Sequence, residues 1–266
     1  MSESLLRRRD KRLLRLTLNR PGKRNALNVA LCSEIVEAVR EAGEDSGIGA
    51  ILLDAEGPAF CAGMDLEESL LPDAAGRTAV HERLFTMGAE ARKPIVAAVH
   101  GAALAGGTGL VANAHVVYAA EQATFGLTEI RIGMWPLVVS RALCLAIGER
   151  RTMEMSLTGR VFGAAEALQY GLVHFVAPAA ELNARVAEAA AQIAAASPAA
   201  LAAGMQYFRE SRGLSWEKRG ELAASLRAGL FAAADYAEGV RAFREKRPPR
   251  WPSAGGPAEK ELSNER

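Results

Sequence analysis

The residues whose types and spacing most clearly suggest a chemical role lie between Lys93 and Pro136. This stretch contains a glycine run at 105–109 (AGGTG) and an acidic residue, Glu129, among apolar neighbours. A glycine turn that follows a strand and opens a helix directs free N–H groups and the positive end of the helix dipole at one point. Such a point holds an anion, permanent or developing. A carboxyl group buried among apolar side chains has a raised pKa and moves protons near neutrality.

Both features also have a structural interpretation. A strand followed by a glycine turn occurs in many α/β domains, and a Glu next to Arg131 is more often half of a surface ion pair. The run at 105–109 matches neither GxGxxG nor GxxxxGK[ST], so we expect no nucleotide phosphate there.

The surrounding segments supply the elements that position this chemistry. Alternating apolar residues predict a strand at 14–18, and apolar residues at helical spacing predict a helix at 27–39 with Asn28 as its N-cap. Buried strands are predicted at 48–53 and 95–99, and each leads into a glycine loop. This order of strands, loops and helices predicts an α/β fold with a largely parallel sheet.

The second half of the chain is predicted to be mainly helical, with a last strand at 172–176. The segment at 67–80 has no sustained period, and we expect it to be mobile. The predicted organisation is a flexible N-terminus at 1–10, an α/β core at 11–177, a helical C-terminal region at 178–246 and a disordered tail at 247–266.

Composition excludes several classes of partner. With 266 residues, half of them hydrophobic, the chain can bury a large core, and no apolar run approaches the roughly 20 residues that span a membrane. A net charge of +1 provides no basic field for nucleic acid. Cys32, Cys61 and Cys144 form no metal-binding pattern. We interpret them as reduced core thiols of a cytoplasmic protein with no metal.

Several segments, in order, resemble the motifs of the enoyl-CoA hydratase/isomerase, or crotonase, family. They are LNRPGKRNALN at 18–28, AFCAGMDL at 59–66, HGAALAGGTGLVANAHVVYA at 100–119, FGLTEIRIGMWP at 125–136, TGRVFGAAEALQYGLVHFV at 158–176 and AFREKR at 242–247. The resemblance implies repeated ββα units that form a spiral core, with a C-terminal helical region for oligomerisation. It also implies an acyl-CoA thioester substrate, no cofactor beyond the coenzyme A of the substrate, and a homotrimer or dimer of trimers.

The resemblance also implies roles for individual residues. The backbone N–H groups of Met64 and Gly106 would form an oxyanion hole for a thioester enolate, and Glu129 would be the acid/base. Asp65 would mainly hold its own loop. The substrate-binding and CoA-binding positions would be Lys23, Arg24, Ala26, Ala62, Asp65, Leu66, Trp135, Phe243 and Lys246. The acyl pocket would be lined by Cys61, Leu70, Phe85 and Trp135.

The chain departs from the family pattern where a second carboxylate is usual. Many hydratases of the family have a second Glu three residues after the oxyanion glycine, and this chain has Gly109 there. Leu137 likewise stands where some isomerases have Asp. One carboxylate suffices to move a proton along an acyl chain, whereas hydration normally uses a second. Replacement candidates, otherwise interpreted as surface groups, are Glu67, Glu68, Asp73, His81 and Glu82.

The reaction therefore stays open between double-bond isomerisation and hydration in fatty-acid or related acyl-CoA catabolism. Two alternatives are a catalytically weak acyl-CoA-binding scaffold and a CoA-thioester hydrolase or decarboxylase on the same fold.

Overall fold

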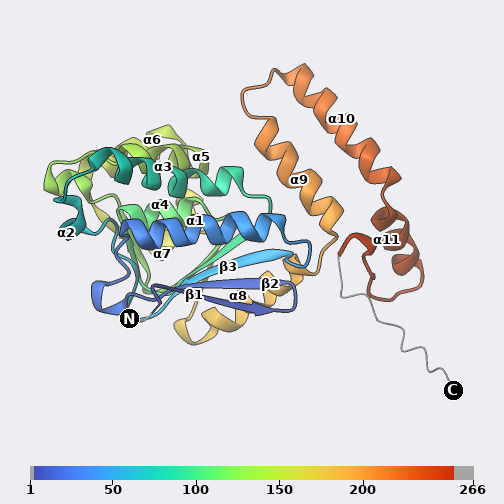
Figure 1. Ribbon diagram of the computed structural model, residues 1–266, viewed down its shortest axis with the longest axis horizontal. Coiled ribbons are helices and arrows are strands. Elements are labelled where there is room, and N and C mark those ends of the chain that lie inside the picture. Colours follow the sequence, from blue (N-terminus) through green and yellow to red (C-terminus); the bar gives the residue numbers. More distant parts are fainter. Residues whose placement is uncertain (1–2, 255–266) are drawn as a thin grey trace. The chain divides into compact units, whose positions relative to one another are not determined.

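The computed structural model describes residues 3–254 of the chain. Two compact units divide these residues. The larger contains residues 3–44 and 48–195, and the smaller contains residues 45–47 and 196–254. The helices and strands of both units are labelled in Figure 1.

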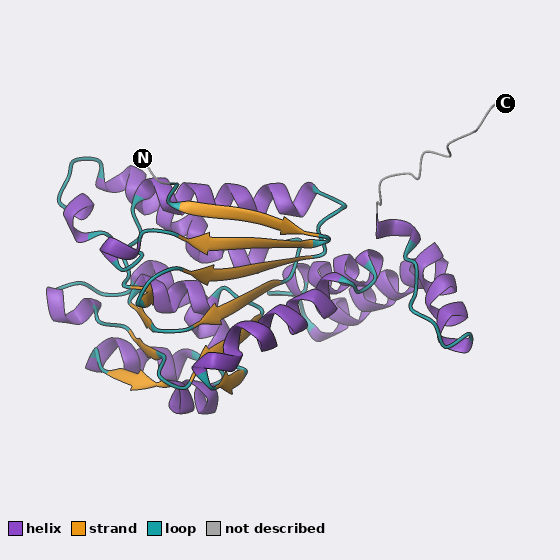
Figure 2. Ribbon diagram, turned by 90° about the horizontal axis from the view of Figure 1, so that it is seen from below, coloured by secondary structure: helices purple, strands orange, loops and turns teal. Residues whose placement is uncertain are grey.

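The larger unit is built on two sheets (Figure 2). One has the order β1-β2-β3-β5-β7-β10, and only β1 and β2 are antiparallel. Its strands are β1 (Leu5–Asp10), β2 (Leu13–Leu18), β3 (Ala50–Ala55), β5 (Ile95–Val99), β7 (Val116–Ala120) and β10 (Phe175–Ala177). The other has the order β4-β6-β8-β9, and its strands are β4 (Ala59–Cys61), β6 (Ala102–Leu104), β8 (Thr124–Gly126) and β9 (Val161–Gly163).

A ββα unit repeats along this chain. In each repeat the first strand joins the larger sheet and the second joins the smaller one: β3 and β4, β5 and β6, then β7 and β8. The segments that follow are α2 (Leu66–Ser69) with α3 (Ala74–Glu90), then α4 (Gly106–Ala112), then the 3₁₀-helix η2 (Glu129–Ile132) with α5 (Leu137–Ile147). The expected α/β class and the ββα repeat are therefore confirmed.

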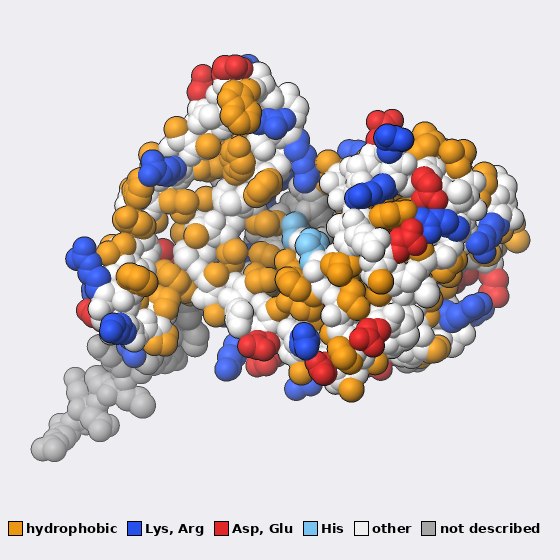
Figure 3. Space-filling view, turned by 180° about the vertical axis from the view of Figure 1, so that it is seen from behind, with side chains coloured by type: hydrophobic (Ala, Val, Ile, Leu, Met, Phe, Trp, Pro, Cys, Tyr) orange, Lys and Arg blue, Asp and Glu red, His pale blue; other side chains and the backbone are white. Residues whose placement is uncertain are grey.

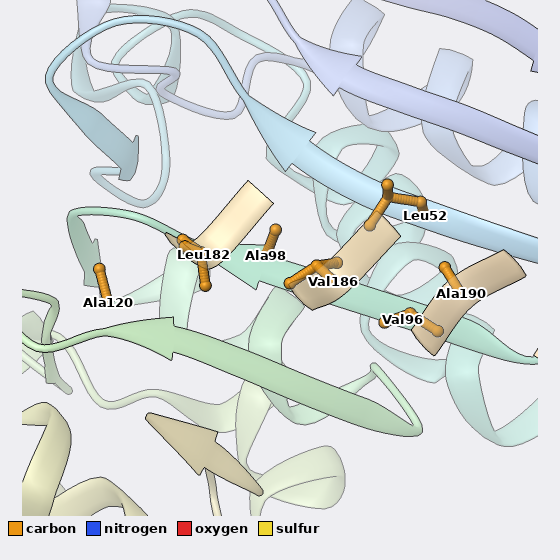
Figure 4. Packing of buried hydrophobic residues seen from close by; sticks show 7 residues of the cluster. All are labelled: Leu52, Val96, Ala98, Ala120, Leu182, Val186 and Ala190. Atoms are coloured by element: carbon orange, nitrogen blue, oxygen red, sulfur yellow. The ribbon is translucent and has the colours of Figure 1, made fainter. Parts of the chain in front are cut away.

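Helices cover both faces of the larger sheet (Figure 1). Helix α1 (Val29–Glu44) lies on one face and begins where sequence predicts, because the N–H of Leu31 donates to Oδ1 of Asn28 at 3.0 Å. Helix α8 (Ala179–Ala194) crosses the other face. Its buried residues join those of three strands in one apolar cluster: Leu52, Val96, Ala98, Ala120, Leu182, Val186 and Ala190 (Figure 4).

Helix α8 belongs to the core, although sequence assigned residues from 178 onward to the C-terminal region. A Cβ at Gly49 would lie 2.2 Å from the carbonyl oxygen of Ala194, so the end of α8 touches the backbone just before β3. The core therefore continues to Ala195. An amphipathic alanine-rich helix has the same pattern whether it covers a sheet or another helix, which is why the sequence misplaced this boundary.

The smaller unit consists of α9 (Pro198–Glu210), α10 (Trp216–Ala232), α11 (Ala234–Arg244) and the 3₁₀-helix η3 (Pro252–Ala254). Ser197 caps α9 by accepting a hydrogen bond from the N–H of Ala200 at 3.1 Å. The hydroxyl of Ser197 also donates to the Oδ2 atom of Asp235 at 2.6 Å, and that of Ser253 donates to the same atom at 2.7 Å. Asp235 thereby ties α11 to both ends of the unit.

Three further expectations need correction. Residues 5–10 form β1 rather than a flexible terminus, because backbone pairing with β2 holds an edge strand whose arginines face solvent. The segment at 67–80, for which no regular structure was expected, contains most of α2 (66–69) and the first two turns of α3 (74–90). Residues 247–254 are fixed to the buried carboxylate of Glu238, through Arg247 at 2.6 Å and the N–H of Arg250 at 2.8 Å. The rest of the predicted tail lies outside the described residues.

The remaining short helices are η1 (Pro21–Lys23), α6 (Glu149–Thr158) and α7 (Ala164–Tyr170). Within residues 3–254 no single helix is long and apolar enough to cross a membrane, and α8 and α9 pass such a test only as a pair with a break between them. Cys32 and Cys61 are buried as expected, but Cys144 is exposed on α5. The prediction that all three are core thiols was wrong at this position.

Candidate active site

The first glycine loop follows β4 and carries Met64. Leu27 and Met64 form an isolated parallel bridge, in which the N–H of Leu27 donates to the carbonyl of Gly63 at 2.8 Å and the N–H of Asp65 donates to the carbonyl of Leu27 at 3.0 Å. The bridge therefore engages the residues on either side of Met64 and not the N–H of Met64 itself.

The second glycine loop joins β6 to α4. Ala105 has a φ of 51°, a left-handed conformation that is strained for a residue with a Cβ and is typical of functional loops. Gly106 is the first residue of α4, so its N–H is among those that a helix start leaves without an internal partner. The buried hydroxyl of Thr108 donates to the carbonyls of Ala103 at 2.7 Å and Gly126 at 3.0 Å. This side chain joins the loop to β8.

The two loops touch each other. A Cβ at Gly63 would lie 2.8 Å from Cβ of Ala105 and 3.2 Å from the backbone nitrogen of Gly106. A Cβ at Gly107 would lie 2.2 Å from the carbonyl oxygen of Cys61. Both positions must therefore be glycine for the backbones to approach this closely. The structure thus brings Met64 and Gly106 into adjoining loops, as the sequence analysis predicted.

Glu129 stands at the start of η2, three residues after β8. Its side chain is half-buried, and its Oε2 atom is fully buried with no hydrogen-bond partner within residues 3–254. Burial raises the pKa of this carboxyl, and a hydrogen bond from its own backbone opposes the effect less strongly. In the described chain Glu129 forms no ion pair with Arg131. An unpartnered, partly desolvated carboxyl is suited to exchanging protons with a ligand.

The apolar neighbours of Glu129 do not surround it as expected. Ile130, Ile132 and Met134 are all exposed. A 3₁₀-helix of one turn points consecutive side chains in different directions, and a sequence window of apolar residues does not reveal which of them face inward.

The space beside Gly109 is already filled. A Cβ at this position would lie 2.6 Å from Cγ1 of Val139 and 2.9 Å from Cδ1 and Cε1 of Phe85. Both neighbours are buried, and the Phe85 ring also reaches the oxyanion loop, since its Cζ would lie 3.1 Å from a Cβ at Gly106. The structure therefore has no room for a second carboxylate at 109 without moving the ring or Val139.

The predicted CoA-binding residues of the larger unit gather around the first loop. The N–H of Ala62 donates to the carbonyl of Arg24 at 3.0 Å. The guanidinium of Arg20 donates both to the carbonyl of Ala26 and to Oδ2 of Asp65, the latter at 2.9 Å. Burial by itself raises the pKa of Asp65. The hydrogen bond and charge of Arg20, together with hydrogen bonds from the backbone of Glu68 and Glu67, outweigh burial and hold this pKa below its usual range. Asp65 thus braces the loop.

Other predicted binding residues differ in their setting. Lys23 is exposed, and its Nζ lies 2.8 Å from Oε1 of Glu67. Leu66 is exposed at the start of α2, and Trp135 is half-buried just before α5. Phe243 and Lys246 lie in the smaller unit, at the end of α11 and just beyond it. Phe243 is 85 % exposed there, so it is available to a ligand or a partner.

The four candidate carboxylates between residues 67 and 82 are all engaged. Glu67 pairs with Lys23, and Oε2 of Glu68 accepts from the N–H of Val29 at the start of α1 at 2.7 Å. Asp73 caps α3 by accepting from the N–H of Gly76 at 2.9 Å, and Glu82 forms an ion pair with Arg141 on α5. Each has a structural partner.

Sequence reasoning did not identify Arg20 and Thr108 as parts of this arrangement. Arg20 braces the first loop, and Thr108 joins the second loop to the strand that leads to Glu129. A Thr within a glycine run is the only sequence signal for the second role. Arg20 stands just before a Pro-Gly turn, and nothing in its spacing indicates a partner 45 residues away.

Comparison with known proteins places this geometry in context. The sequence pattern of the enoyl-CoA hydratase/isomerase family matches residues 8–254. A probable enoyl-CoA hydratase of Mycobacterium bovis is 37 % identical over 257 residues, which cover 94 % of this chain and 98 % of that protein. The 2,3-dehydroadipyl-CoA hydratase of Escherichia coli is 36 % identical, with the same shares covered.

Solved structures agree with the sequence matches. The crystal structure of an enoyl-CoA hydratase of Mycobacterium smegmatis superposes with a TM-score of 0.88 at 32 % identity, and the match covers 94 % of this chain and 99 % of that one. Two adjoining glycine loops, a buried carboxyl and a family pattern along nearly the whole described chain lead to one conclusion: the chain belongs to the enoyl-CoA hydratase/isomerase family.

Proposed function

We propose that this enzyme transfers a proton at the carbon next to the thioester carbonyl of an enoyl-CoA, with Glu129 as the acid/base. The observation that carries the proposal is the state of this carboxyl: its Oε2 atom is buried without a partner in the described residues, and burial raises its pKa. A carboxyl in this state takes up and returns protons at neutral pH more readily than one exposed to water.

The charge that forms on the thioester oxygen needs stabilisation in the same step. The N–H groups of Met64 and Gly106 are the proposed donors, because the bridge to Leu27 does not use the first and the start of α4 leaves the second free. Donors of this kind contribute on the order of 3 kcal/mol each to the stability of such a transition state. The chemistry needs no cofactor besides the coenzyme A that the substrate carries.

Double-bond isomerisation is the reaction that a single carboxylate best supports. Glu129 would take a proton from Cα of a 3-enoyl-CoA, the double bond would move to the Cα–Cβ position, and the same carboxyl would return the proton at Cγ. Phe85 and Val139 fill the place of a second carboxylate beside Gly109, and this favours a mechanism with one proton carrier.

Hydration is a second candidate function. It is favoured by the relatives, since those of Mycobacterium bovis and Escherichia coli are both named as hydratases. In that reaction water would add at Cβ while Glu129 delivers a proton to Cα. Either reaction would belong to fatty-acid or related acyl-CoA catabolism.

Product analysis tests the proposal. The protein is incubated separately with a 2-enoyl-CoA and a 3-enoyl-CoA, and the products are identified by chromatography and mass. We expect an isomer of unchanged mass, a gain of one water, or both, and we expect Glu129→Gln to abolish them while CoA-ester binding persists. Free CoA or loss of CO₂ as the main product would instead indicate a hydrolase or decarboxylase, and binding without turnover would indicate a scaffold.

We also propose that the protein assembles as a homotrimer or a dimer of trimers. Hydrophobic side chains reach the surface in many places on the face of the molecule that Figure 3 shows. The helices of the smaller unit expose large ones, including Phe208 on α9 and Trp216 on α10, at 69 % and 84 % exposure. Exposed apolar groups of this size on a helical unit are typical of a contact surface. Light scattering coupled to gel filtration measures the assembly mass, and a monomer would contradict the proposal.

A further inference from the structure

Helix α3 carries a histidine that the chemistry described so far does not use. His81 is 7 % exposed, and its Nε2 atom is fully buried with no hydrogen-bond partner in the described part of the chain. A buried polar atom without a partner loses its hydration and gains nothing in return, so such atoms are rare and need an explanation. Oε2 of Glu129, the proposed acid/base, is in the same state.

The position of His81 connects it with the oxyanion loops. Residues four apart lie one above the other on a helix, so His81 and Phe85 share one face of α3. The centroids of their rings are 6.4 Å apart. The Phe85 ring in turn touches the positions of Gly106 and Gly109, within 3.1 Å of a Cβ at either one. His81 therefore lies on the face of α3 that covers the second oxyanion loop, one turn before the ring that fills the place of the second carboxylate.

The other candidate residues between 67 and 82 already have structural partners. Glu67, Glu68, Asp73 and Glu82 are held by an ion pair, a backbone N–H or a helix cap. Among the candidates between residues 67 and 82, His81 alone has a buried polar atom that no other group of the described chain engages.

We propose that His81 is the second proton-transfer group of the site and holds the oxygen that bonds to Cβ in hydration. This inference rests on the proposed function. Nε2 accepts a proton from water as its oxygen bonds to Cβ, the electrons of the double bond move into the thioester enolate, and Glu129 gives its proton to Cα. Hydration thus begins with Glu129 in its protonated form, the form that it also reaches in isomerisation after it takes the α-proton. The proton on the imidazole then passes through solvent to Glu129, so one water is added and both side chains return to the states in which hydration began.

The protonation state of His81 suits this role. Burial lowers the pKa of the imidazole. The negative charge of Glu68 on α2 raises this pKa and the positive charge of Arg77 on α3 lowers it, and the net shift is downward. The lowered pKa keeps the ring neutral near pH 7, and a neutral ring with its proton on Nδ1 presents Nε2 as an acceptor.

The test separates hydration from isomerisation in the same protein. His81→Phe keeps an aromatic ring at the position and removes both nitrogens. We expect it to lower kcat for hydration of a 2-enoyl-CoA by about 100-fold or more, the usual contribution of a general acid or base. Isomerisation of a 3-enoyl-CoA, which requires Glu129 alone, should stay within about threefold of wild type, because its transition state makes no contact with the imidazole.

A structural role for His81 would change both rates together and lower the melting temperature. We expect the melting temperature of His81→Phe to equal or exceed that of wild type, because the variant removes a polar atom that has no partner. Glu82→Gln is the matched control: it alters the next residue of the same helix, and both of its rates should match wild type.

Each result decides the question. Hydration by His81→Phe at the wild-type rate would overturn the inference, and so would a wild-type protein that isomerises but adds no water. Loss of both reactions in Glu129→Gln together with the selective loss in His81→Phe would support both proposals. A wild-type protein with neither activity would refute the proposed function itself.

Discussion

Replacing Gly109 with alanine tests the claim that the place of the second carboxylate is occupied. The new methyl group would meet Cγ1 of Val139 at 2.6 Å and the Phe85 ring at 2.9 Å, both shorter than real Cβ contacts. Val139 is 2 % exposed and Phe85 is 4 % exposed, so neither can move into solvent. Alanine gains about 1 kcal/mol over glycine inside a helix, whereas overpacking a core loses about 1–3 kcal/mol. We therefore expect a net loss of up to about 2 kcal/mol, from these two terms.

Equilibrium unfolding in urea, at fixed protein concentration and followed by circular dichroism, measures this loss. Gly43→Ala in α1 is the matched control, since a Cβ there meets only Arg92 at 3.4 Å, an ordinary contact. We expect the control to be as stable as wild type or more stable, by up to about 1 kcal/mol. Phe85→Leu combined with Gly109→Ala should recover part of the loss, with a coupling energy of about 0.5–3 kcal/mol between the two sites. A Gly109→Ala variant at least as stable as wild type would refute the packing argument.

Three further predictions concern Glu129 and the two loops. Glu129→Gln should be more stable than wild type at pH 7 by on the order of 1 kcal/mol, because the buried carboxylate loses hydration. The folded-state pKa of Glu129 is raised above 4.5, the ordinary pKa of Glu, so the carboxyl is protonated in both the folded and the unfolded protein once the pH falls below 4.5. The stability gained by Glu129→Gln should therefore disappear at low pH, and urea unfolding at pH 7 and pH 4 checks this. Gly107→Ala should abolish turnover and lower the melting temperature, since its Cβ would lie 2.2 Å from the carbonyl oxygen of Cys61; normal activity would contradict the close approach of the loops. Arg20→Met should lower kcat and destabilise the protein by about 1.5–3 kcal/mol, the range for a hydrogen bond to a charged group, because Arg20 and Asp65 form a partly buried ion pair; unchanged kinetics would show that the brace on Asp65 is dispensable.

Much of the fold follows from local patterns in the sequence. The apolar run opened by Pro94 predicts a strand at 95–99, and β5 has these bounds. Asn28 caps α1, as predicted, and Ser197 before Pro198 is a comparable local signal for the start of α9. These predictions succeed because periodicity and capping act within a few residues of each other.

The N-terminal strand could not be predicted in the same way. β1 reads LLRRRD and has no apolar alternation, because an edge strand with exposed side chains is held by backbone pairing with β2. Pairing partners are set by tertiary structure rather than by the composition of the strand.

The candidate site also has features that the sequence predicts and features that only the packing of the helices reveals. Glu129 and the glycine loops were predictable from motif and order, as was the lack of a second carboxylate at Gly109. Sequence could not show that Phe85 fills the vacated place or that His81 retains an unpartnered nitrogen. Both facts depend on how α3 packs against α4, and side chains 24 to 28 residues apart in the chain carry no local signal of that contact.

Deuterium uptake at Cα tests the central claim most directly. A 3-enoyl-CoA is incubated with the protein in D₂O, and the mass and position of the label are determined in recovered substrate and product. If Glu129 removes the α-proton against an oxyanion hole of Met64 and Gly106 and exchanges it with solvent, wild type incorporates deuterium at Cα of the recovered substrate and at Cγ of the product. Glu129→Gln is expected to bind the thioester without incorporating deuterium. Exchange by Glu129→Gln at the wild-type rate would contradict the account.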